Sequence, residues 1–321
     1  MRRREFIALV GGFAAAWPLA ARAQTKMPVI GFLGLAFPDD PAVAVNLQAF
    51  RQGLSEIGYV EGQNVTFVYR WAHYNELILP ALAAELVALK VDVIVTEGST
   101  IPSLAAKRAT TTIPIVFHAG DAIEEGLVNN LARPGGNLTG VSLFAPERLS
   151  KSFQLLSELV PMAKVIALLS IPSSTTKVVP EIQETARARG VRLQFLTATT
   201  DSEIDTALAS LGQQQAAAVV LASAPFADKI VGLASRYAVP AVYSQSLFVT
   251  AGGLLSYGPS IPAAYVIKGS YAGKILKGEK PSDLPVVQPT SFALAINLKT
   301  ARMLGLTVPP TLLAQADQVI E

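Results

Sequence analysis

Residues 113–117 read IPIVF and residues 239–243 read VPAVY, so one apolar pattern returns after an interval of 126 residues. The same interval separates VIV at residues 93–95 from VVL at residues 219–221. Short apolar runs bounded by turn-forming residues are typical of buried strands in a parallel sheet. A constant interval between equivalent strands predicts two lobes of the same α/β construction, each built on an open parallel sheet. The alternative is a chance likeness among α/β strands.

Apolar runs alternate with longer amphipathic segments along most of the chain, which predicts strands joined by crossover helices that flank each sheet. The glycine-rich residues 135–140 follow Arg133-Pro134 rather than a strand, so we expect a loop there. The expected strands are residues 29–33, 65–69, 93–96, 115–117, 165–169, 191–196, 218–221 and 241–243. The expected helices are residues 42–57, 77–89 and 149–160, with another that begins near Pro102.

The composition excludes several classes of site. Of the 321 residues, 51% are hydrophobic, 16% are charged and none is a cysteine. A chain of this length can bury cores for two or three domains without disulfides. The lack of cysteine excludes zinc–cysteine sites, iron–sulfur clusters and thiol nucleophiles, and the chain has only two histidines, His73 and His118. We therefore expect no metal and no cofactor.

The first residues have the three parts of an export signal. Residues 2–4 are arginines, an apolar run follows and ends at Pro18, and residues 21–23 read ARA. A membrane anchor would need about 20 apolar residues, roughly twice the length of this run. We expect cleavage after Ala23 and a product in the periplasm. Residues 3–7 (RREFI) also resemble the twin-arginine pattern, which suggests the export route.

Charge and hydropathy limit the partners of the mature chain. Removal of residues 1–23 leaves 22 basic and 23 acidic residues, so the mature chain is nearly neutral. A neutral chain without a basic cluster predicts no nucleic-acid binding. No second apolar stretch of eighteen residues occurs, so we expect no stable membrane insertion.

The sequence lacks the motifs of common enzyme classes. It contains no Gly-x-Ser-x-Gly elbow, no phosphate-binding Gly-x4-Gly-Lys-Ser/Thr loop and no Gly-x-Gly-x-x-Gly after a strand. The nearest acid–base pair is His118 with Asp121, for which no nucleophile is in view. We therefore expect a binding protein and not an enzyme.

Six stretches of the mature chain carry a resemblance to a known family. They are residues 50–54 (FRQGL), 58–65 (GYVEGQNV), 111–117 (TTIPIVF), 130–141 (NLARPGGNLTGV), 252–258 (GGLLSYG) and 296–301 (INLKTA). In this order they resemble the periplasmic substrate-binding proteins of ABC transporters related to the tryptophan/tyrosine-binding type. The resemblance implies a type I periplasmic-binding-protein fold, in which three segments cross between the lobes and the cleft closes on a small molecule.

The resemblance also implies how the chain is divided into lobes and which partners it binds. After the signal at residues 1–23, the first lobe would comprise residues 27–145 plus 261–286, and the second lobe residues 146–260 plus 287–321. The expected partners are a small-molecule ligand and an ABC transporter permease, and we expect a monomer.

Ligands of open parallel sheets bind beyond the carboxyl ends of the strands, so the cleft between the lobes is the predicted site. Ser99 and Thr100 open a helix there, and helix-end amides and hydroxyls suit a carboxylate; helix capping is the alternative. Asp121 matches the family's Gly-Asp step and is expected to bind a ligand ammonium, with Glu97 as the rival acid. Its alternative role is to cap a helix over residues 122–131.

Further candidate ligand-binding residues lie at strand ends and in nearby loops. Aromatic side chains there can stack on a planar ligand, although each can equally pack under its own loop. From the first lobe these are Phe37, Trp71 and His118, and from the second lobe Ser173, Ser174, Phe226, Tyr243, Gln245 and Tyr257.

The sequence departs from the family pattern within this set. Glu97 stands where a small or hydroxyl residue is usual, and Ser173 and Ser174 replace asparagine-rich steps. The expected ligand is therefore a small metabolite, an amino acid or an aromatic carboxylate, that the protein delivers to a permease. The alternatives are a sensor that presents its closed form to a membrane receptor and a periplasmic enzyme.

Overall fold

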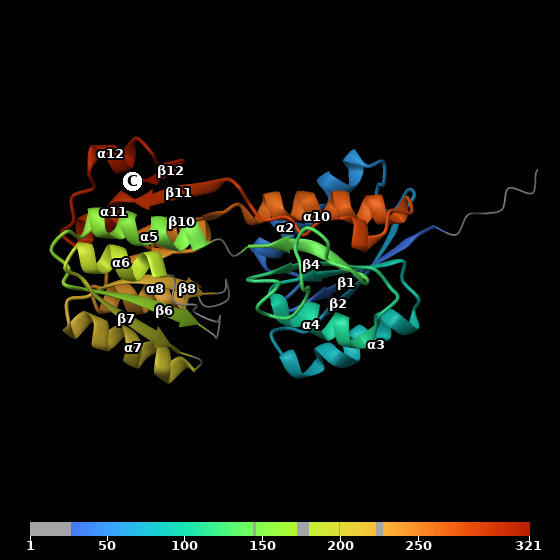
Figure 1. Ribbon diagram of the computed structural model, residues 1–321, viewed down its shortest axis with the longest axis horizontal. Helices are drawn as coiled ribbons and strands as arrows, with labels where there is room; N and C mark the ends of the chain where they lie inside the picture. Colours follow the sequence, from blue (N-terminus) through green and yellow to red (C-terminus); the bar gives the residue numbers. More distant parts are fainter. Residues whose placement is uncertain (1–26, 144–145, 172–179, 199, 223–226) are drawn as a thin grey trace, which may run out of the picture.

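The computed structural model describes residues 27–143, 146–171, 180–198, 200–222 and 227–321. It contains two α/β lobes that lie side by side, each built on one sheet flanked by helices (Figure 1). The two-lobed fold predicted from the repeated interval is confirmed.

The first sheet has the strand order β2-β1-β3-β4-β5, and every neighbouring pair is parallel. Every residue of the last three strands is buried, since helices cover both faces of the sheet. The strands are β1 (Val29–Gly34), β2 (Thr66–Trp71), β3 (Val93–Glu97), β4 (Ile115–Ala119) and β5 (Leu138–Ser142). The covering helices are α2 (Pro41–Glu56), α3 (Leu79–Ala88), which follows the short helix η1 (Glu76–Ile78), α4 (Thr100–Ala109) and α10 (Ile261–Leu276).

Strand β5 corrects a prediction made from sequence. The loop expected over residues 135–140 ends at β5, whose five residues pair with β4. Gly140 is required by this pairing, because a Cβ there would lie 2.0 Å from the carbonyl oxygen of Phe117, and its φ is +153°. The glycines that suggested a loop therefore include one that allows two strands to approach closely.

Helix α10 comes from far along the sequence and lies beside α2 (Figure 1). Two glycines let the helices approach closely. A Cβ at Gly53 would lie 1.9 Å from the carbonyl oxygen of Val266, and a Cβ at Gly269 would lie 2.1 Å from that of Phe50. Together the helices bury the face of the sheet that carries Phe32.

The second sheet has the order β12-β11-β10-β9-β8-β6-β7. It departs from the expected all-parallel form, because β11 runs antiparallel to β10. The strands are β6 (Val165–Ile171), β7 (Arg192–Thr197), β8 (Ala217–Ala222), β9 (Ala241–Tyr243), β10 (Leu255–Pro259), β11 (Phe292–Asn297) and β12 (Gln318–Ile320). The helices that accompany them are α5 (Pro146–Leu159), α6 (Pro180–Ala188), α7 (Asp201–Gln213), α8 (Ala227–Arg236), α9 (Ser246–Thr250), α11 (Leu298–Met303) and α12 (Pro310–Leu313), with the short helix η3 (Pro281–Asp283) before β11.

Three segments of chain pass between the lobes. They connect β5 to α5, β10 to α10 through Ser260, and η3 to β11 through residues 284–291. The third segment is tied to the first sheet, since the backbone N–H of Ser142 donates to the carbonyl oxygen of Val287 at 2.9 Å. Within the described ranges, no helix is long and apolar enough to cross a membrane.

Candidate functional site

The carboxyl ends of the two sheets face each other. The strands of the first sheet are parallel, so their carboxyl ends share the edge from which β5 continues into the second lobe. In the second sheet, β10 is parallel to β9 and continues from its carboxyl end into α10 of the first lobe. Both carboxyl edges therefore look into the space between the lobes (Figure 1), where ligands of open α/β sheets bind.

An aromatic cluster stands at the carboxyl end of β1 and β2. The ring of Phe37, which is 45% exposed, stacks on His73 at a centroid distance of 5.0 Å and meets the edge of Tyr74 at 5.5 Å. His73 and Tyr74 are held at φ of +51° and +58°, a region that costs a non-glycine residue about 1–2 kcal/mol. The Tyr74 hydroxyl donates to Asp40 Oδ2 at 3.0 Å, which fixes this strained turn beside Phe37.

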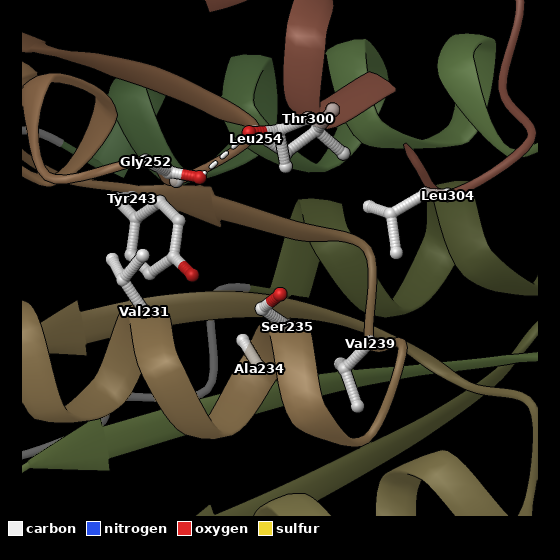
Figure 2. A pocket seen from close by; sticks show the side chains of 10 residues that line it. Val231, Ala234, Ser235, Val239, Tyr243, Gly252, Leu254, Thr300 and Leu304 are labelled. Atoms are coloured by element: carbon white, nitrogen blue, oxygen red, sulfur yellow. Dashed lines mark hydrogen bonds between the residues drawn. The ribbon is translucent and has the colours of Figure 1, made fainter. Parts of the chain in front are cut away.

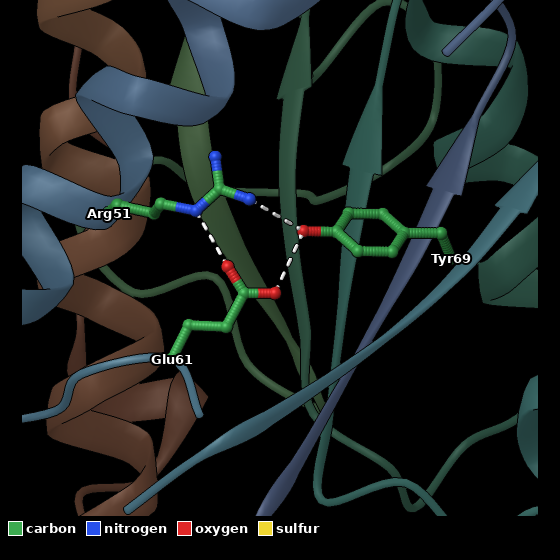
Figure 3. A network of polar contacts seen from close by, with 3 residues as sticks. All are labelled: Arg51, Glu61 and Tyr69. Carbon is green, nitrogen blue, oxygen red and sulfur yellow. Dashed lines mark hydrogen bonds and ion pairs between the residues drawn. The ribbon is translucent and has the colours of Figure 1, made fainter. Parts of the chain in front are cut away.

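Trp71 is the last residue of β2, the edge strand of the first sheet, and its ring is held by neighbouring residues. Its ring lies over Gly34, where a Cβ would come within 2.1 Å of it, and stacks on Tyr69 at 5.9 Å. Figure 3 shows how Tyr69 is held: its hydroxyl donates to Glu61 at 3.2 Å and accepts from Arg51 at 3.0 Å. The Arg51–Glu61 ion pair, at 2.6 Å, closes the network. Burial raises the pKa of Tyr69 to about 12, so the phenol stays protonated as a donor.

Glu97 lies at the carboxyl end of β3 but is buried, with 4% of its surface exposed. Burial raises the pKa of Glu97, and the opposing charge of Lys268 limits the rise. Glu97 shares this buried position with Tyr265, whose pKa is raised well above its usual value by burial and by the charge of Glu97. Glu97 is therefore a buried acid behind the edge and not an exposed residue of the cleft wall.

His118 is also buried, and its partner is Lys268 of α10. The Lys268 ammonium donates to the carbonyl oxygen of Thr96 at 2.7 Å, lies 3.3 Å from His118 Nδ1, and stands 3.7 Å from the centre of the Tyr265 ring. Burial, together with the Lys268 charge, lowers the pKa of His118 well below its usual value, so the imidazole is neutral. In this setting His118 accepts from a lysine inside the first lobe and does not form the acid–base pair with Asp121.

The helix start at Ser99 and Thr100 has partners of its own. Ser99 caps α4, since its hydroxyl accepts from the backbone N–H of Ile101 at 3.2 Å. The Thr100 hydroxyl donates to Glu125 and accepts from the backbone N–H of Gly120 at 3.2 Å. Burial raises the pKa of Glu125, and the bond from Thr100 opposes this rise. An acid therefore stands where a ligand carboxylate was predicted to bind.

Asp121 plays a capping role in the described structure. Its Oδ1 atom accepts from the backbone N–H groups of Ile123 and Glu124, both at 3.1 Å. The helix considered as its alternative partner, over residues 122–131, does not form; residues 122–126 make turns instead. The side chain is half-buried at the carboxyl end of β4, as its sequence position indicates.

In the second lobe, Tyr243 belongs to the core. It is 2% exposed, and its ring stacks on Phe248 at 4.9 Å. Figure 2 shows it lining a small hollow with Val231 of α8, where the Thr300 hydroxyl donates to the carbonyl oxygen of Gly252 at 2.7 Å. The ring of Tyr243 is therefore buried in this structure, and its contact with a ligand stays a prediction.

The remaining candidate ligand-binding residues of the second lobe are Gln245, Tyr257 and three residues that the structure does not describe. Gln245 lies two residues after the end of β9, is half-buried and makes no side-chain capping bond to α9. Tyr257 of β10 is half-buried with its ring 5.6 Å from that of Phe292, and burial raises its pKa. Three predicted residues, Ser173, Ser174 and Phe226, lie outside the described residues.

The assembled first-lobe edge is acidic and aromatic. Carboxylates follow the ends of two strands, Asp40 after β1 and Asp121 and Glu125 after β4, whereas Glu97 at the end of β3 is buried behind the edge. A surface lined by charges of one sign attracts a ligand group of the other sign. The described residues contain no cluster of three or more His, Cys, Asp or Glu able to hold a metal ion.

Two functional residues escaped the sequence prediction. The burial of Lys268 could have been inferred from sequence. It lies three residues after Tyr265 and four before Ala272, on the buried face of α10. Glu125 had no such signal, since the turn that brings it to Thr100 replaces an expected helix.

Comparisons with known proteins agree with this architecture. A family model described as ABC transporter substrate binding protein matches residues 35–320. The chain is 27% identical over 277 residues to a tyrosine-binding protein of Clostridioides difficile (strain R20291), covering 84% of this chain and 79% of the relative.

Solved structures give the same result. A conserved domain protein from Vibrio cholerae superposes with a TM-score of 0.82 at 27% identity, covering 92% of this chain and all of that one. A Streptococcus pneumoniae ABC domain in complex with L-Trp gives 0.80 at 26% identity, covering 91% and 99%. Periplasmic binding proteins at 13–15% identity share the fold alone, with TM-scores of 0.54 to 0.56.

Proposed function

Since this chain belongs to the family of ABC transporter substrate-binding proteins, we propose that its ligand is an amino acid or an aromatic carboxylate bound between the carboxyl edges of the two lobes. As a member of that family, the protein captures a small molecule and delivers it to an ABC transporter permease. Closure of the lobes on the ligand is the signal that such a protein presents.

The main support for the ligand proposal is the exposed ring of Phe37, which lies beside the acidic carboxyl edge of the first sheet. A large apolar side chain that is 45% exposed leaves stacking surface for a planar group. The carboxylates of Asp121 and Glu125 lie at the same edge of the sheet and favour a ligand ammonium. The named ligands of two relatives, tyrosine and L-Trp, combine these two chemical features.

The site proposed from sequence is kept in part. Asp121 is the proposed partner of a ligand ammonium, with Glu97 as the rival acid, and Phe37, Trp71, Gln245 and Tyr257 are proposed to line the cleft. Ser99 and Thr100 are proposed as polar lining residues rather than as the carboxylate site.

Location and organisation are also proposals. The export signal at residues 1–23, with its twin-arginine pattern, supports a mature protein in the periplasm. The lobes are proposed to comprise residues 27–145 plus 261–286 and residues 146–260 plus 287–321, in a monomer. N-terminal sequencing of the exported protein tests the signal: a start at Gln24 supports it, and an intact Met1 as the main species contradicts it.

Two experiments test the proposed function against its alternatives. Native mass spectrometry of the exported protein should detect a bound amino acid or aromatic acid, and that molecule should be recovered unchanged. Recovery of a chemically converted product would favour a periplasmic enzyme. Deletion of the gene should abolish uptake of the same molecule, whereas intact uptake with a lost transcriptional response would favour a sensor.

A further inference from the structure

Arg148 is a buried cation for which no counter-charge is found among the described residues. It lies in the first turn of α5 and is only 8% exposed. Among the residues that the structure describes, neither its Nε nor its Nη1 atom has a hydrogen-bond partner. Burial lowers the pKa of Arg148 to about 10, and among the described residues no carboxylate opposes this shift. A buried charge that nothing compensates is costly to a folded protein.

Ser152 repeats the pattern one turn further along the same helix. It is 1% exposed, and within the described part of the chain its Oγ atom also lacks a hydrogen-bond partner. Residues four apart lie on the same face of an α-helix. The start of α5 therefore presents several unsatisfied donors on one buried face.

The position of α5 places these donors toward the space between the lobes. The helix follows the crossing segment from β5 and ends before β6, so it runs antiparallel to the strands of the second sheet. Its first turn therefore lies at the carboxyl edge of that sheet, the edge that faces the first lobe. Arg148 is at this end of α5, while Asp121 and Glu125 lie at the carboxyl edge of the first sheet.

We propose that the guanidinium of Arg148 binds the carboxylate of the ligand. The fork of an arginine matches a carboxylate in shape and charge, and a bound carboxylate would compensate the buried cation. Ser152 is a second donor on the same face. Thr100, the position predicted from sequence, is less suitable because its hydroxyl donates to Glu125. With acids on the first lobe and Arg148 on the second, the ligand class becomes a zwitterion, an amino acid held across the cleft; this rests on the proposed function.

The test compares L-tyrosine with tyramine, which has the same ring and amine but no carboxylate. Calorimetry on the full chain should show L-tyrosine bound about 10- to 100-fold more weakly by Arg148→Met, as expected for lost hydrogen bonds to a charged group. Tyramine should bind both proteins equally. Arg148→Lys keeps the charge without the fork and should recover part of the affinity.

Stability of the ligand-free protein gives a second readout that needs no ligand. An arginine with only a structural role would destabilise the fold when truncated. An uncompensated buried guanidinium replaced by methionine should instead raise the melting temperature by about 2–4 °C. Arg236→Met is the matched control: Arg236 is an exposed helical arginine of the same lobe, and its loss should change neither readout.

The outcomes separate this proposal from the proposed function. If wild type binds L-tyrosine and Arg148→Met binds it equally well, the role of Arg148 is overturned while the proposed function stands. A lower melting temperature in Arg148→Met, with the preference for L-tyrosine over tyramine intact, also overturns it. If no amino acid or aromatic carboxylate stabilises wild type, the proposed ligand class fails and this proposal fails with it.

Discussion

At the scale of single residues, the first lobe contains a buried polar cluster formed by Glu97, His118, Tyr265 and Lys268. Each of these groups would be costly to bury alone. Together they give the Lys268 ammonium a carbonyl oxygen, an imidazole nitrogen and an aromatic face. The cluster ties α10 to the ends of β3 and β4, directly behind the cleft edge.

This cluster predicts a pH dependence of stability. The folded protein keeps His118 neutral, whereas the unfolded chain protonates it below a pH of about 6.5. The unfolded chain then binds the extra proton, so the His118 contribution to stability is full above that pH and is lost as the pH falls. Between pH 6.5 and 5 the loss should approach 1.4 kcal/mol per pH unit, at roughly the limit set by one proton.

Urea unfolding of wild type and His118→Asn from pH 5 to 8 checks this expectation. Glu97, whose pKa burial raises, acts in the opposite direction, so the comparison is made between variant and wild type at each pH. The stability difference between them should change with pH below 6.5. His73→Asn is the control, since His73 is exposed and asparagine tolerates its left-handed backbone. A difference that stays constant with pH contradicts the assignment.

The two acids proposed to meet a ligand ammonium can be told apart by amide substitution. We expect Asp121→Asn to weaken L-tyrosine binding by about 2–5 kcal/mol, because a buried ammonium would lose its counter-charge. Asparagine can still cap the N–H groups of Ile123 and Glu124, so the fold should be kept. Binding of 3-(4-hydroxyphenyl)propionate, which lacks the amine, should not change.

The matching variant Glu97→Gln and the exposed control Asp39→Asn complete this series, all measured by calorimetry. Normal binding by Asp121→Asn with a loss in Glu97→Gln would assign the ammonium to Glu97. If both variants bind L-tyrosine normally, the ammonium has no partner at this edge and the amino-acid proposal loses its support.

Prediction from sequence was weakest at this scale. It placed Glu97 and His118 at the strand ends, where they are, but it could not show that α10 covers them with Lys268. It also could not show that Thr100 meets Glu125, because that contact depends on a turn 25 residues away. Side-chain partners of this kind are set by tertiary packing, which local pattern does not record.

At the scale of elements, the close contact of α2 and α10 connects the C-terminal part of the chain to the first lobe. Gly53 and Gly269 have no room for a Cβ, because backbone carbonyl oxygens of the facing helix occupy that space. Gly269→Ala should therefore force the helices apart and lower the free energy of unfolding by about 1–3 kcal/mol, the usual effect of overpacking.

Chemical denaturation measures this effect, with Gly232→Ala as the control. A Cβ at Gly232, in α8, would meet nothing within 4 Å, so alanine should stabilise the protein by up to about 1 kcal/mol through its helix propensity. Equal effects of the two substitutions would show that the contact between α2 and α10 does not constrain the fold.

Most of the strands could be predicted from periodicity. Strands β1, β3, β6 and β9 begin at the predicted residues, because a buried parallel strand is a short apolar run. Strand β5 escaped because its sequence, LTGVS, is neither strongly apolar nor alternating. Strand β11 was not among the strands expected from periodicity, and periodicity does not give the direction of a strand, so its antiparallel pairing was not predicted.

At the scale of the whole molecule, the repeated interval of 126 residues predicted two similar lobes, and the structure contains them. The interval could not reveal that α10 returns to the first lobe; that expectation came from the family resemblance. The order of the strands and the three crossing segments then place both carboxyl edges face to face. A ligand held by both edges would join the lobes.

The measurement that tests this account most directly is isothermal titration calorimetry of the full chain with the aromatic L-amino acids, benzoate and 4-hydroxybenzoate. The account predicts that at least one of them binds with a stoichiometry of one per chain, because each chain has one pair of facing carboxyl edges. The heat capacity change should be negative, since closure buries apolar surface that includes Phe37. No saturable binding by any of these molecules would contradict the proposal that this protein carries an amino acid or aromatic acid.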